Sequence, residues 1–311
     1  VKNEETDRYD LIKKLNYDYA FFLTATPIQN ELTDLYNIVS LLRPGLFGSR
    51  DTFHHYFVNN SQETLVNRDE LQRRLGQVMI RNKRKDTDID FTERIIDTRT
   101  FEPSECEKEL YDAVTEYVRG AYSQDQGQKL VLMLLQKEVV SSPAALEQTI
   151  RKQLDDQNEL THRDELETIM DKIDAVETVT KQERLFDIVE EVRERVEMGR
   201  VIVFTQFRPT QRQLLSVLAD EGYTTHAFHG GHSSQEKEDI VDQFREEGGV
   251  LVSTDAMNEG RNLQFSNIMV NYDLPWNPMK VEQRIGRIHR IGQKRKVYVF
   301  NMGLKGTIEE Y

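Results

Sequence analysis

The sequence predicts an α/β protein in which residues 181–311 form a doubly wound parallel sheet. Short apolar runs typical of buried strands alternate with helix-like segments throughout this region. Strands that alternate with helices pair in parallel, because each helix returns the chain to the same end of the sheet. Residues 44–180 differ, since they are highly charged and their apolar residues follow helical spacing without a strand pattern. We therefore expect three regions: 1–43, a helical insertion and linker over 44–180, and 181–311.

The sheet of residues 181–311 is expected to contain five strands. They are Val201–Phe204, Thr224–Phe228, Val250–Ser253, Ile268–Asn271 and Val297–Phe300. After the first strand, Leu214, Leu215 and Leu218 predict a helix that ends at Gly222. Ser233 and Glu236 have the spacing of a capping box, which predicts that a second helix begins there.

Residues 1–43 predict one strand followed by one helix. Ala20–Leu23 is short, apolar and aromatic, as a buried strand would be. Pro27 suits the first turn of a helix, where its missing N–H costs nothing. Apolar residues then recur at spacings of four and three, which predicts a helix with one apolar face. Pro44 and Gly45 are expected to end this helix, and the residues of its apolar face are Ile28, Leu32, Leu35, Val39 and Leu42.

The middle region predicts several helices. One apolar face is formed by Leu110, Val114, Tyr117 and Ala121. Leu130–Val140 predicts a second helix that ends near Ser141–Pro143, and Ala144–Thr180 predicts one or two long polar helices. Asp86–Asp90 is expected to be an exposed linker.

Charge and composition restrict the function. The net charge of −13 argues against a nucleic-acid binder, but Lys280–Lys296 holds seven Lys or Arg and one acid. Arg73–Lys85 holds six and no acid, and either run could meet phosphates or be a solvated helix face. The lone Cys106 excludes an internal disulfide framework and an all-cysteine metal site, and we expect no metal ligands. No apolar run reaches the roughly 18 residues of a membrane span, so we expect no membrane association.

Polar residues and glycines follow three of the predicted strands. They are Thr205–Phe207, His229–Gly231, and Thr254–Asp255 running on to Gly260–Asn262. Parallel strands present their carboxyl ends at one edge, where ligands of such sheets bind. Hydroxyls, amides and glycines at that edge suit a phosphodiester backbone, although ordinary turns use the same residues.

The segment Gln283–Arg290 is rich in arginine. On a helix, Gln283, Arg287 and Arg290 would share a face, and Gly286 would permit another backbone to approach closely. Aligned guanidinium groups suit the charge that develops during phosphoryl transfer. The spacing alone does not decide between this role and a basic helix face that binds DNA.

Four segments resemble motifs of Swi/Snf-type ATPases of helicase superfamily two. Thr24–Asn30 resembles the coupling motif at the end of the first motor lobe, and Val201–Phe207 is similar to the first strand of the second lobe. Ser253–Gln264 resembles the fifth helicase motif, and Glu282–Gln293 the sixth. The resemblance implies RecA-like lobes: the end of lobe one in residues 1–43 and lobe two in residues 181–311.

The resemblance also implies site residues. Arg287 and Arg290 match arginine fingers, and Gln283 matches a residue that lines the nucleotide cleft. Gly260 and Asp255 match positions near ATP and the inter-lobe path, and Gly286 is expected to belong to the same nucleotide site. The positions that match a track along the DNA backbone are Thr24, Thr26, Gln206, His229 and Thr254. In the fifth motif, Met257 and Asn258 replace the usual pair of glycines and Arg261 replaces an apolar residue, which puts the fine geometry of this loop in doubt.

The resemblance implies ATP and Mg²⁺ as cofactors and double-stranded DNA as partner. Met79–Asn82 and Ser141–Pro143 look closest to the prokaryotic branch that includes an RNA-polymerase-associated ATPase. That branch implies RNA polymerase or another nucleoprotein as partner and a cytoplasmic, nucleoid-associated location. However, no Gly-Lys-Ser or Gly-Lys-Thr string occurs in the chain. We therefore expect these residues to belong to a longer ATPase and to be inactive alone.

Three functions remain open. The first is an ATP-driven translocase on double-stranded DNA. The second is a strand-separating helicase of DNA or RNA built on the same lobes. The third is a non-catalytic lobe that recruits a partner through the helical middle region.

Overall fold

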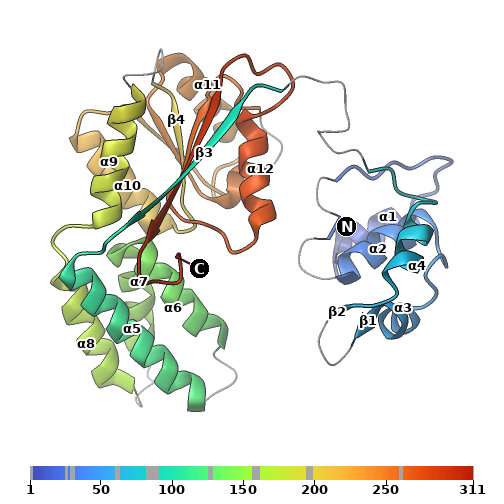
Figure 1. Ribbon diagram of the computed structural model, residues 1–311, viewed down its shortest axis with the longest axis horizontal. Coiled ribbons are helices and arrows are strands. Elements are labelled where there is room, and N and C mark those ends of the chain that lie inside the picture. Colours follow the sequence, from blue (N-terminus) through green and yellow to red (C-terminus); the bar gives the residue numbers. More distant parts are fainter. Residues whose placement is uncertain are drawn as a thin grey trace. The chain divides into compact units, whose positions relative to one another are not determined.

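The computed structural model describes residues 3–24, 27–28, 32–59, 64–81, 91–124, 129–155, 162–193, 199–258 and 262–310 (Figure 1). The chain divides into two compact units, Val1–Ile89 and Asp90–Tyr311. The predicted linker Asp86–Asp90 lies outside the described residues.

The first unit is mainly helical. Its helices are α1 (Asp7–Lys14), α2 (Leu32–Leu42), α3 (Arg50–Phe57) and α4 (Arg68–Leu75), and β1 (Val58–Asn59) pairs antiparallel with β2 (Thr64–Leu65). The Ser49 side chain caps α3 by accepting a hydrogen bond from the Thr52 N–H. Phe47, Phe53 and Phe57 pack together in the core of this unit, which explains its compactness.

Two predictions for the first unit need correction. Ala20–Leu23 is not a strand, and Phe21 and Leu23 are 86% and 95% exposed. A strand needs a hydrogen-bonding neighbour, and no described strand of this unit pairs with this segment. The predicted helix is confirmed from Leu32 to Leu42 with Leu35 and Val39 buried, whereas Ile28 lies outside it and is exposed.

The second unit contains a six-stranded sheet in the order β3-β8-β7-β4-β6-β5, with every pairing parallel. Its strands are β3 (Arg94–Phe101), β4 (Val201–Phe204), β5 (Thr225–Phe228), β6 (Val250–Ser253), β7 (Ile268–Asn271) and β8 (Val297–Leu304). The predicted α/β class and all five predicted strands are confirmed. The last strand continues to Leu304, four residues beyond its predicted end.

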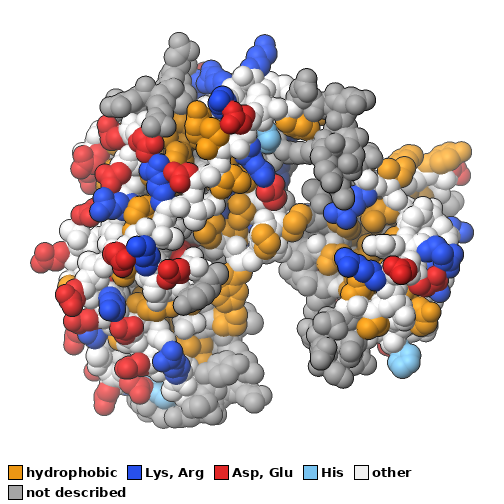
Figure 2. Space-filling model, in the orientation of Figure 1, with side chains coloured by type: hydrophobic (Ala, Val, Ile, Leu, Met, Phe, Trp, Pro, Cys, Tyr) orange, Lys and Arg blue, Asp and Glu red, His pale blue; other side chains and the backbone are white. Residues whose placement is uncertain are grey.

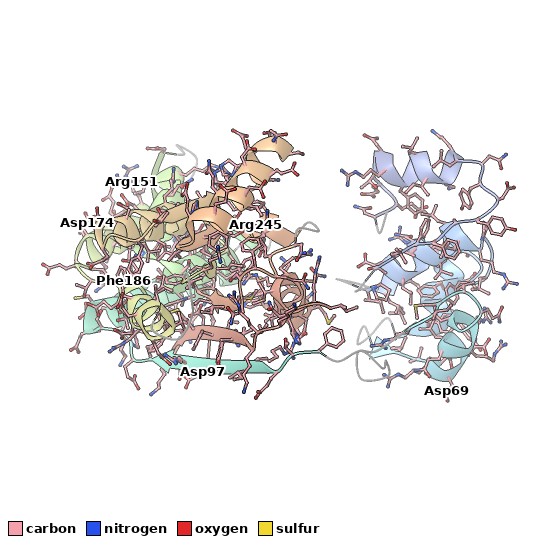
Figure 3. All side chains as sticks on the ribbon, turned by 90° about the horizontal axis from the view of Figure 1, so that it is seen from above. Asp69, Asp97, Arg151, Asp174, Phe186 and Arg245 are labelled. Carbon is pink, nitrogen blue, oxygen red and sulfur yellow. The ribbon has the colours of Figure 1, made fainter. Side chains whose placement is uncertain are left out.

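β3 contradicts the purely helical interpretation of residues 44–180. It lies at the edge of the sheet, paired with β8 over its whole length, and Figure 3 labels Asp97 on it. The strand carries the charged residues Arg94, Asp97 and Arg99. An edge strand tolerates such residues because it is only partly covered by other elements. Its pairing partner lies about two hundred residues later in the chain, which local patterns do not reveal.

Helices cover both faces of the sheet (Figure 1). α9 (Thr180–Arg193) and α10 (Arg208–Asp220) share a core with one face, through residues such as Ile188 and Leu214. α11 (Ser234–Glu247) and α12 (Pro278–Ile288) share a core with the other face, through Phe244 and Ile285. β4, β6 and β7 are therefore buried on both sides, which accounts for their uninterrupted apolar sequences.

The capping box predicted from Ser233 and Glu236 is confirmed at the start of α11, where both reciprocal hydrogen bonds form. Beyond the sheet, a bundle of four helices packs around its own core. It consists of α5 (Glu105–Gln124), α6 (Lys129–Ser141), α7 (Pro143–Asp155) and α8 (Arg163–Asp174). The predicted helix face with Leu110, Val114, Tyr117 and Ala121 is buried in this core.

The surface view shows many acidic side chains over the bundle (Figure 2). On α8 they include Asp164, Glu165, Glu167, Asp171 and Asp174, all exposed. The net negative charge of the protein is therefore gathered partly on the bundle. None of the described helices combines the length and the apolar character that a membrane span requires.

Candidate nucleotide and nucleic-acid site

The carboxyl ends of β4, β6 and β5 lie side by side in the sheet. Gln206, Thr254 and His229 directly follow or closely follow these three strands, as the sequence predicted. Two hydrogen bonds extend the pairing past the strand ends: Thr205 N donates to the Ser253 carbonyl, and Thr254 N to the Phe228 carbonyl, both at 3.0 Å. These bonds hold the three strand ends at one edge of the sheet.

Gln206 is held in place by residues that follow β7, the other strand that pairs with β4. Its backbone N–H donates to the Asp273 carboxylate at 2.8 Å, and its side-chain Nε2 donates to the Leu274 carbonyl at 3.1 Å. Both donors are thus tied to consecutive residues after β7. The position of Gln206 at the edge follows from these two bonds.

His229 lies in a cluster of basic groups. Its ring stacks on that of His232 with 3.6 Å between centroids, and Arg208 Nη2 lies 3.0 Å from His229 Nε2. Partial burial lowers the pKa of His229, and the neighbouring His232 and Arg208 lower that pKa further. The imidazole is therefore neutral at neutral pH and accepts the hydrogen bond that the guanidinium donates.

α12 carries the arginine-rich segment. The Asn277 side chain caps its N-terminus by accepting a hydrogen bond from Met279 N at 2.9 Å. Gln283 and Arg287 lie four residues apart on the helix, so they share a face. The helix ends at Ile288, so Arg290 lies beyond it, contrary to the prediction that all three residues share one helix face.

The early end of α12 has a local cause. His289 leaves helical backbone geometry with φ −100° and ψ 80°, and its Nε2 donates to the Thr92 carbonyl at 2.8 Å. Arg290 Nε then donates to the Gly286 carbonyl at 2.7 Å, which directs the side chain back along the helix. Arg290 thus stays near Arg287 by a hydrogen bond rather than by helical spacing.

Arg287 is half-buried next to Arg290. Burial lowers the pKa of Arg287, and the positive charge of Arg290 lowers the same pKa further. Two guanidinium groups that interact in a partly desolvated place favour an anionic ligand. The donor set fits the phosphate groups of a nucleotide.

Gly286 does not make the expected close contact within the described chain. A Cβ atom built at this position would meet no atom within 4 Å. The space in front of the glycine is therefore open.

Sequence patterns did not single out Arg284, which is fully buried. Its Nη1 donates to Asn271 Oδ1 at 2.9 Å and to the Asp273 carbonyl at 3.0 Å, and its guanidinium lies 4.8 Å from the Phe204 ring centroid. Arg284 therefore connects α12 to the ends of β4 and β7. A signal was present, because Val281, Arg284 and Ile288 follow the spacing of the buried face.

Asp255 pairs with two cations. Its Oδ1 accepts from Arg284 Nη2 at 2.7 Å, and its Oδ2 accepts from Lys280 Nζ at 3.2 Å. Burial opposes ionisation of this carboxyl group, but the charges of Arg284 and Lys280 outweigh burial and lower the pKa of Asp255. Asp255 is thus an ionised bridge between the end of β6 and α12.

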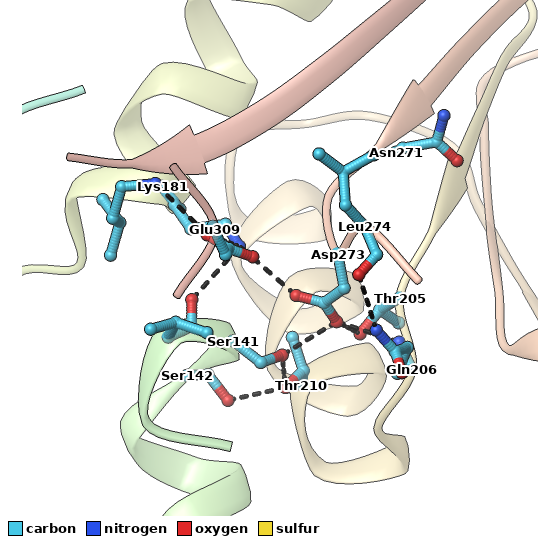
Figure 4. A network of polar contacts seen from close by, with 12 residues as sticks. Ser141, Ser142, Lys181, Thr205, Gln206, Thr210, Asn271, Asp273, Leu274 and Glu309 are labelled. Carbon is cyan, nitrogen blue, oxygen red and sulfur yellow. Dashed lines mark hydrogen bonds and ion pairs between the residues drawn. The ribbon is translucent and has the colours of Figure 1, made fainter. Parts of the chain in front are cut away.

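A second buried network lies at the end of β7 (Figure 4). Asp273 accepts hydrogen bonds from Thr205 Oγ1 and Ser141 Oγ, and it pairs with the fully buried Lys181. Lys181 Nζ also pairs with Glu309 Oε1 at 2.9 Å. Asp273 follows the fourth predicted strand. The rule that selected polar residues after the other predicted strands would therefore have selected it too.

The remaining predicted positions are less defined. Thr24 belongs to the first unit and is exposed. Thr26 and Gly260 lie outside the described residues, as does Arg261. In the same loop, Met257 is fully buried in the core beneath α11 and α12, which accounts for an apolar residue in place of a glycine. Within the described ranges, no cluster of His, Cys, Asp or Glu is arranged to hold a metal ion.

The chain is similar to known proteins. Residues 1–175 match the SNF2-related domain, and residues 180–292 match the helicase conserved C-terminal domain. An uncharacterized ATP-dependent helicase of Bacillus subtilis (strain 168), YqhH, is 38% identical over 311 residues, which are 100% of this chain and 55% of the relative. The CHD3-type chromatin-remodeling factor PICKLE of Arabidopsis thaliana is 26% identical over 323 residues, covering 100% of this chain and 22% of the relative.

Solved structures agree with this relationship. The Sulfolobus solfataricus SWI2/SNF2 ATPase core in complex with dsDNA matches with a TM-score of 0.52 and 25% identity, over 99% of this chain and 62% of that one. The Pyrococcus furiosus Hef helicase domain has the same fold, with a TM-score of 0.52 and 18% identity over 86% of this chain and 64% of that one. The chain spans about half the length of its Bacillus relative. The chain belongs to the SNF2 family of helicases, and its parallel sheet is RecA-like.

Proposed function

We propose that this chain is part of an ATP-dependent motor that moves along double-stranded DNA. The observation that carries the proposal is the half-buried Arg287 beside Arg290, at the C-terminal end of α12. Two relatives support it: one is named an ATP-dependent helicase, and one SWI2/SNF2 ATPase core was solved with double-stranded DNA.

We propose that Arg287 and Arg290 act as arginine fingers. ATP with Mg²⁺ would supply the phosphoanhydride bond, and the two guanidinium groups would neutralise charge on its terminal phosphate. Gln283 and the open face of Gly286 would line the nucleotide cleft, with Gly260 near it. Asp255 would hold its loop through Arg284 and Lys280.

No Gly-Lys-Ser or Gly-Lys-Thr string, and so no phosphate-cradling loop of that type, occurs in the 311 residues. We therefore expect these residues alone to release no phosphate from ATP. The longer protein would release phosphate upon addition of DNA. Turnover by the 311 residues alone would contradict this assignment.

We propose that the DNA backbone contacts Gln206, His229 and Thr254 at the ends of three adjacent strands. Thr24 and Thr26 would belong to the same track from the first lobe. Backbone amides, hydroxyls and amide side chains bind phosphates without reading sequence, as movement along DNA requires.

We also propose which segments of the chain form the two motor lobes. Residues 1–43 would end the first motor lobe, residues 44–180 would form an insertion, and residues 181–311 the second lobe. β3 is then an edge strand that the insertion adds to the sheet of lobe two.

The direct test is Arg287→Ala in the full-length protein. We expect DNA-stimulated phosphate release to fall at least about a hundredfold, the magnitude typical of losing a transition-state contact. DNA affinity should change less than about threefold, since a finger meets ATP and not DNA. Arg151→Ala is the matched control, because Arg151 is an exposed arginine of α7 paired only with Glu147 among described residues. Loss of DNA binding with retained turnover would assign Arg287 to the DNA track instead.

A strand-separating helicase is the second candidate, since relatives carry that name. The two functions differ in whether the strands part. A translocase displaces a triplex-forming strand or a bound protein while leaving the duplex annealed. Release of a labelled strand from a forked duplex, dependent on ATP, would favour the helicase.

A further inference from the structure

A buried charged cluster, formed by Lys181, Asp273 and Glu309, joins the helical bundle to the edge of the sheet (Figure 4). Lys181 is fully buried, Asp273 is 2% exposed, and the side chain of Glu309 is 7% exposed. Burying charges is costly unless each charge is paired and hydrogen-bonded, as these three groups are. None of the three belongs to the proposed nucleotide or DNA contacts.

Asp273 organises the loop that carries Gln206. One carboxylate oxygen, Oδ2, accepts from Thr205 Oγ1 at 2.5 Å, from Gln206 N at 2.8 Å and from Ser141 Oγ at 2.9 Å. Hydrogen bonds to an ionised acceptor are about twice as strong as neutral ones. The turn between β4 and α10 is therefore built around this one oxygen.

Lys181 holds the Asp273 carboxylate in place. Its Nζ lies 3.3 Å from Asp273 Oδ1 and 2.9 Å from Glu309 Oε1, and it donates to the Val140 carbonyl at 3.1 Å. Without this cation, two buried carboxyl groups would face each other in the same place. Burial, together with Asp273, already raises the pKa of Glu309 to about 7.

The bundle reaches the same loop. Ser141 and Ser142, at the junction of α6 and α7, hydrogen-bond to Thr210 in the first turn of α10 at 2.8 and 2.7 Å. Ser141 also donates to Asp273. The strand-end loop is thus held between the end of β7 on one side and the bundle on the other.

We propose that Asp273 is a positioning residue that sets Gln206 against the DNA backbone, and that Lys181 and the Ser141–Ser142 junction hold Asp273 there. This inference rests on the proposed contact between Gln206 and DNA. It makes the bundle part of the DNA-binding machinery, because displacement of the bundle would loosen the Gln206 loop.

The test is a double-mutant cycle in the full-length protein. Gln206→Ala, Asp273→Asn and the double variant are compared for the DNA concentration that half-activates ATP hydrolysis. We expect each single change to raise this concentration about tenfold, the loss expected for one hydrogen bond to a charged group. The double variant should be no worse than Gln206→Ala, because Asp273 acts through Gln206.

Further readouts separate positioning from general structural damage. The KM for ATP should stay within about twofold in the Asp273→Asn variant, and the salt dependence of DNA binding should stay unchanged, as in Gln206→Ala, because glutamine carries no charge. Lys181→Met should resemble Asp273→Asn, and Lys181→Arg should restore part of the DNA activation because it retains the cation. Asp174→Asn, the same change at an exposed position of α8, serves as control.

If Asp273→Asn does not fold, Thr205→Val replaces it in the double-mutant cycle, since this change removes one hydrogen-bond donor to Asp273 at nearly constant volume. Effects of Asp273 or Thr205 that add fully to that of Gln206 would overturn the positioning role. An unchanged DNA activation in Gln206→Ala alone would instead overturn the proposed DNA contact, and the inference with it.

Discussion

Arg284 and Asp255 form an ion pair with 2.7 Å between Nη2 and Oδ1, and it joins α12 to the end of β6. The arginine side chain is fully buried, and its Nη1 donates to Asn271 Oδ1 and to the Asp273 carbonyl. One side chain therefore links α12, which bears Arg287, to the ends of β6 and β7 and, through the Phe204 ring, to the end of β4. The segment that sequence patterns assigned to phosphate contains a structural arginine as well.

Arg284→Met should destabilise the protein strongly. The change leaves Asp255 without its buried partner and two oxygens near β7 without a donor, which together cost about 3–5 kcal/mol of unfolding free energy. Urea denaturation followed by circular dichroism measures the loss. Arg151→Met is the control, since its exposed pair with Glu147 contributes at most about 0.5 kcal/mol. A loss below about 1 kcal/mol for Arg284→Met would refute a structural role.

Glu138→Gln should change how stability depends on pH. Glu138 is buried in the bundle and accepts a hydrogen bond from Thr149, and burial raises its pKa to about 7. An acid with a raised pKa binds more protons in the folded state, so stability falls as the pH rises from about 4.5 through 7.

Glutamine stays neutral and removes this contribution. The variant should match the wild type at pH 5 and exceed it at pH 8 by up to about 3 kcal/mol. Thermal melts from pH 5 to 8 test the difference, with Glu167→Gln at an exposed position of α8 as control. Parallel pH profiles for Glu138→Gln and the wild type would show that Glu138 is ionised in the folded protein at no cost.

His229 should make DNA binding pH-dependent. Its pKa is lowered from 6.5, so it is neutral at pH 7.5 and gains a proton only below pH 6.5. His232 and Arg208 oppose this proton and Glu236 favours it. DNA phosphates would favour the charged form, so affinity should rise on acidification from pH 7.5 to 5.5, together with a steeper salt dependence.

Fluorescence anisotropy with the full-length protein and duplex DNA measures this effect. His229→Gln should reduce the rise in affinity, and His55→Gln, an exposed histidine of the first unit, should leave it unchanged. An identical pH dependence in His229→Gln would remove His229 from the proposed DNA track.

Gly286→Ala should separate stability from activity. Alanine is favoured over glycine inside a helix by about 1 kcal/mol, and the new Cβ meets no atom within 4 Å. We therefore expect a slightly higher melting temperature together with a higher KM for ATP, because the methyl group would occupy space proposed for the nucleotide. Gly120→Ala in α5 also places its Cβ in open space and should change stability alone. Unchanged ATP kinetics in Gly286→Ala would show that the space is not used by the nucleotide.

Local sequence determined the central strands and most helices of this protein. β4, β6 and β7 are buried on both faces, so the hydrophobic effect requires continuous apolar runs, and such runs are visible in the sequence. Gln206 and Thr254 followed from β4 and β6, and His229 followed from the predicted strand Thr224–Phe228. The motif order also led to the family, which the match to the SNF2-related domain confirmed.

Only the tertiary structure decided the features that depend on distant partners. β3 is a strand because β8 supplies its hydrogen bonds, and Ala20–Leu23 is not one because no described strand of its unit does. In the sequence, nothing distinguishes three of the buried charged residues, Arg284, Asp273 and Lys181, from other charged residues. The fold alone brings their partners within about 3 Å. A charge can be buried only where a counter-charge from another element meets it, and that meeting is a property of the fold.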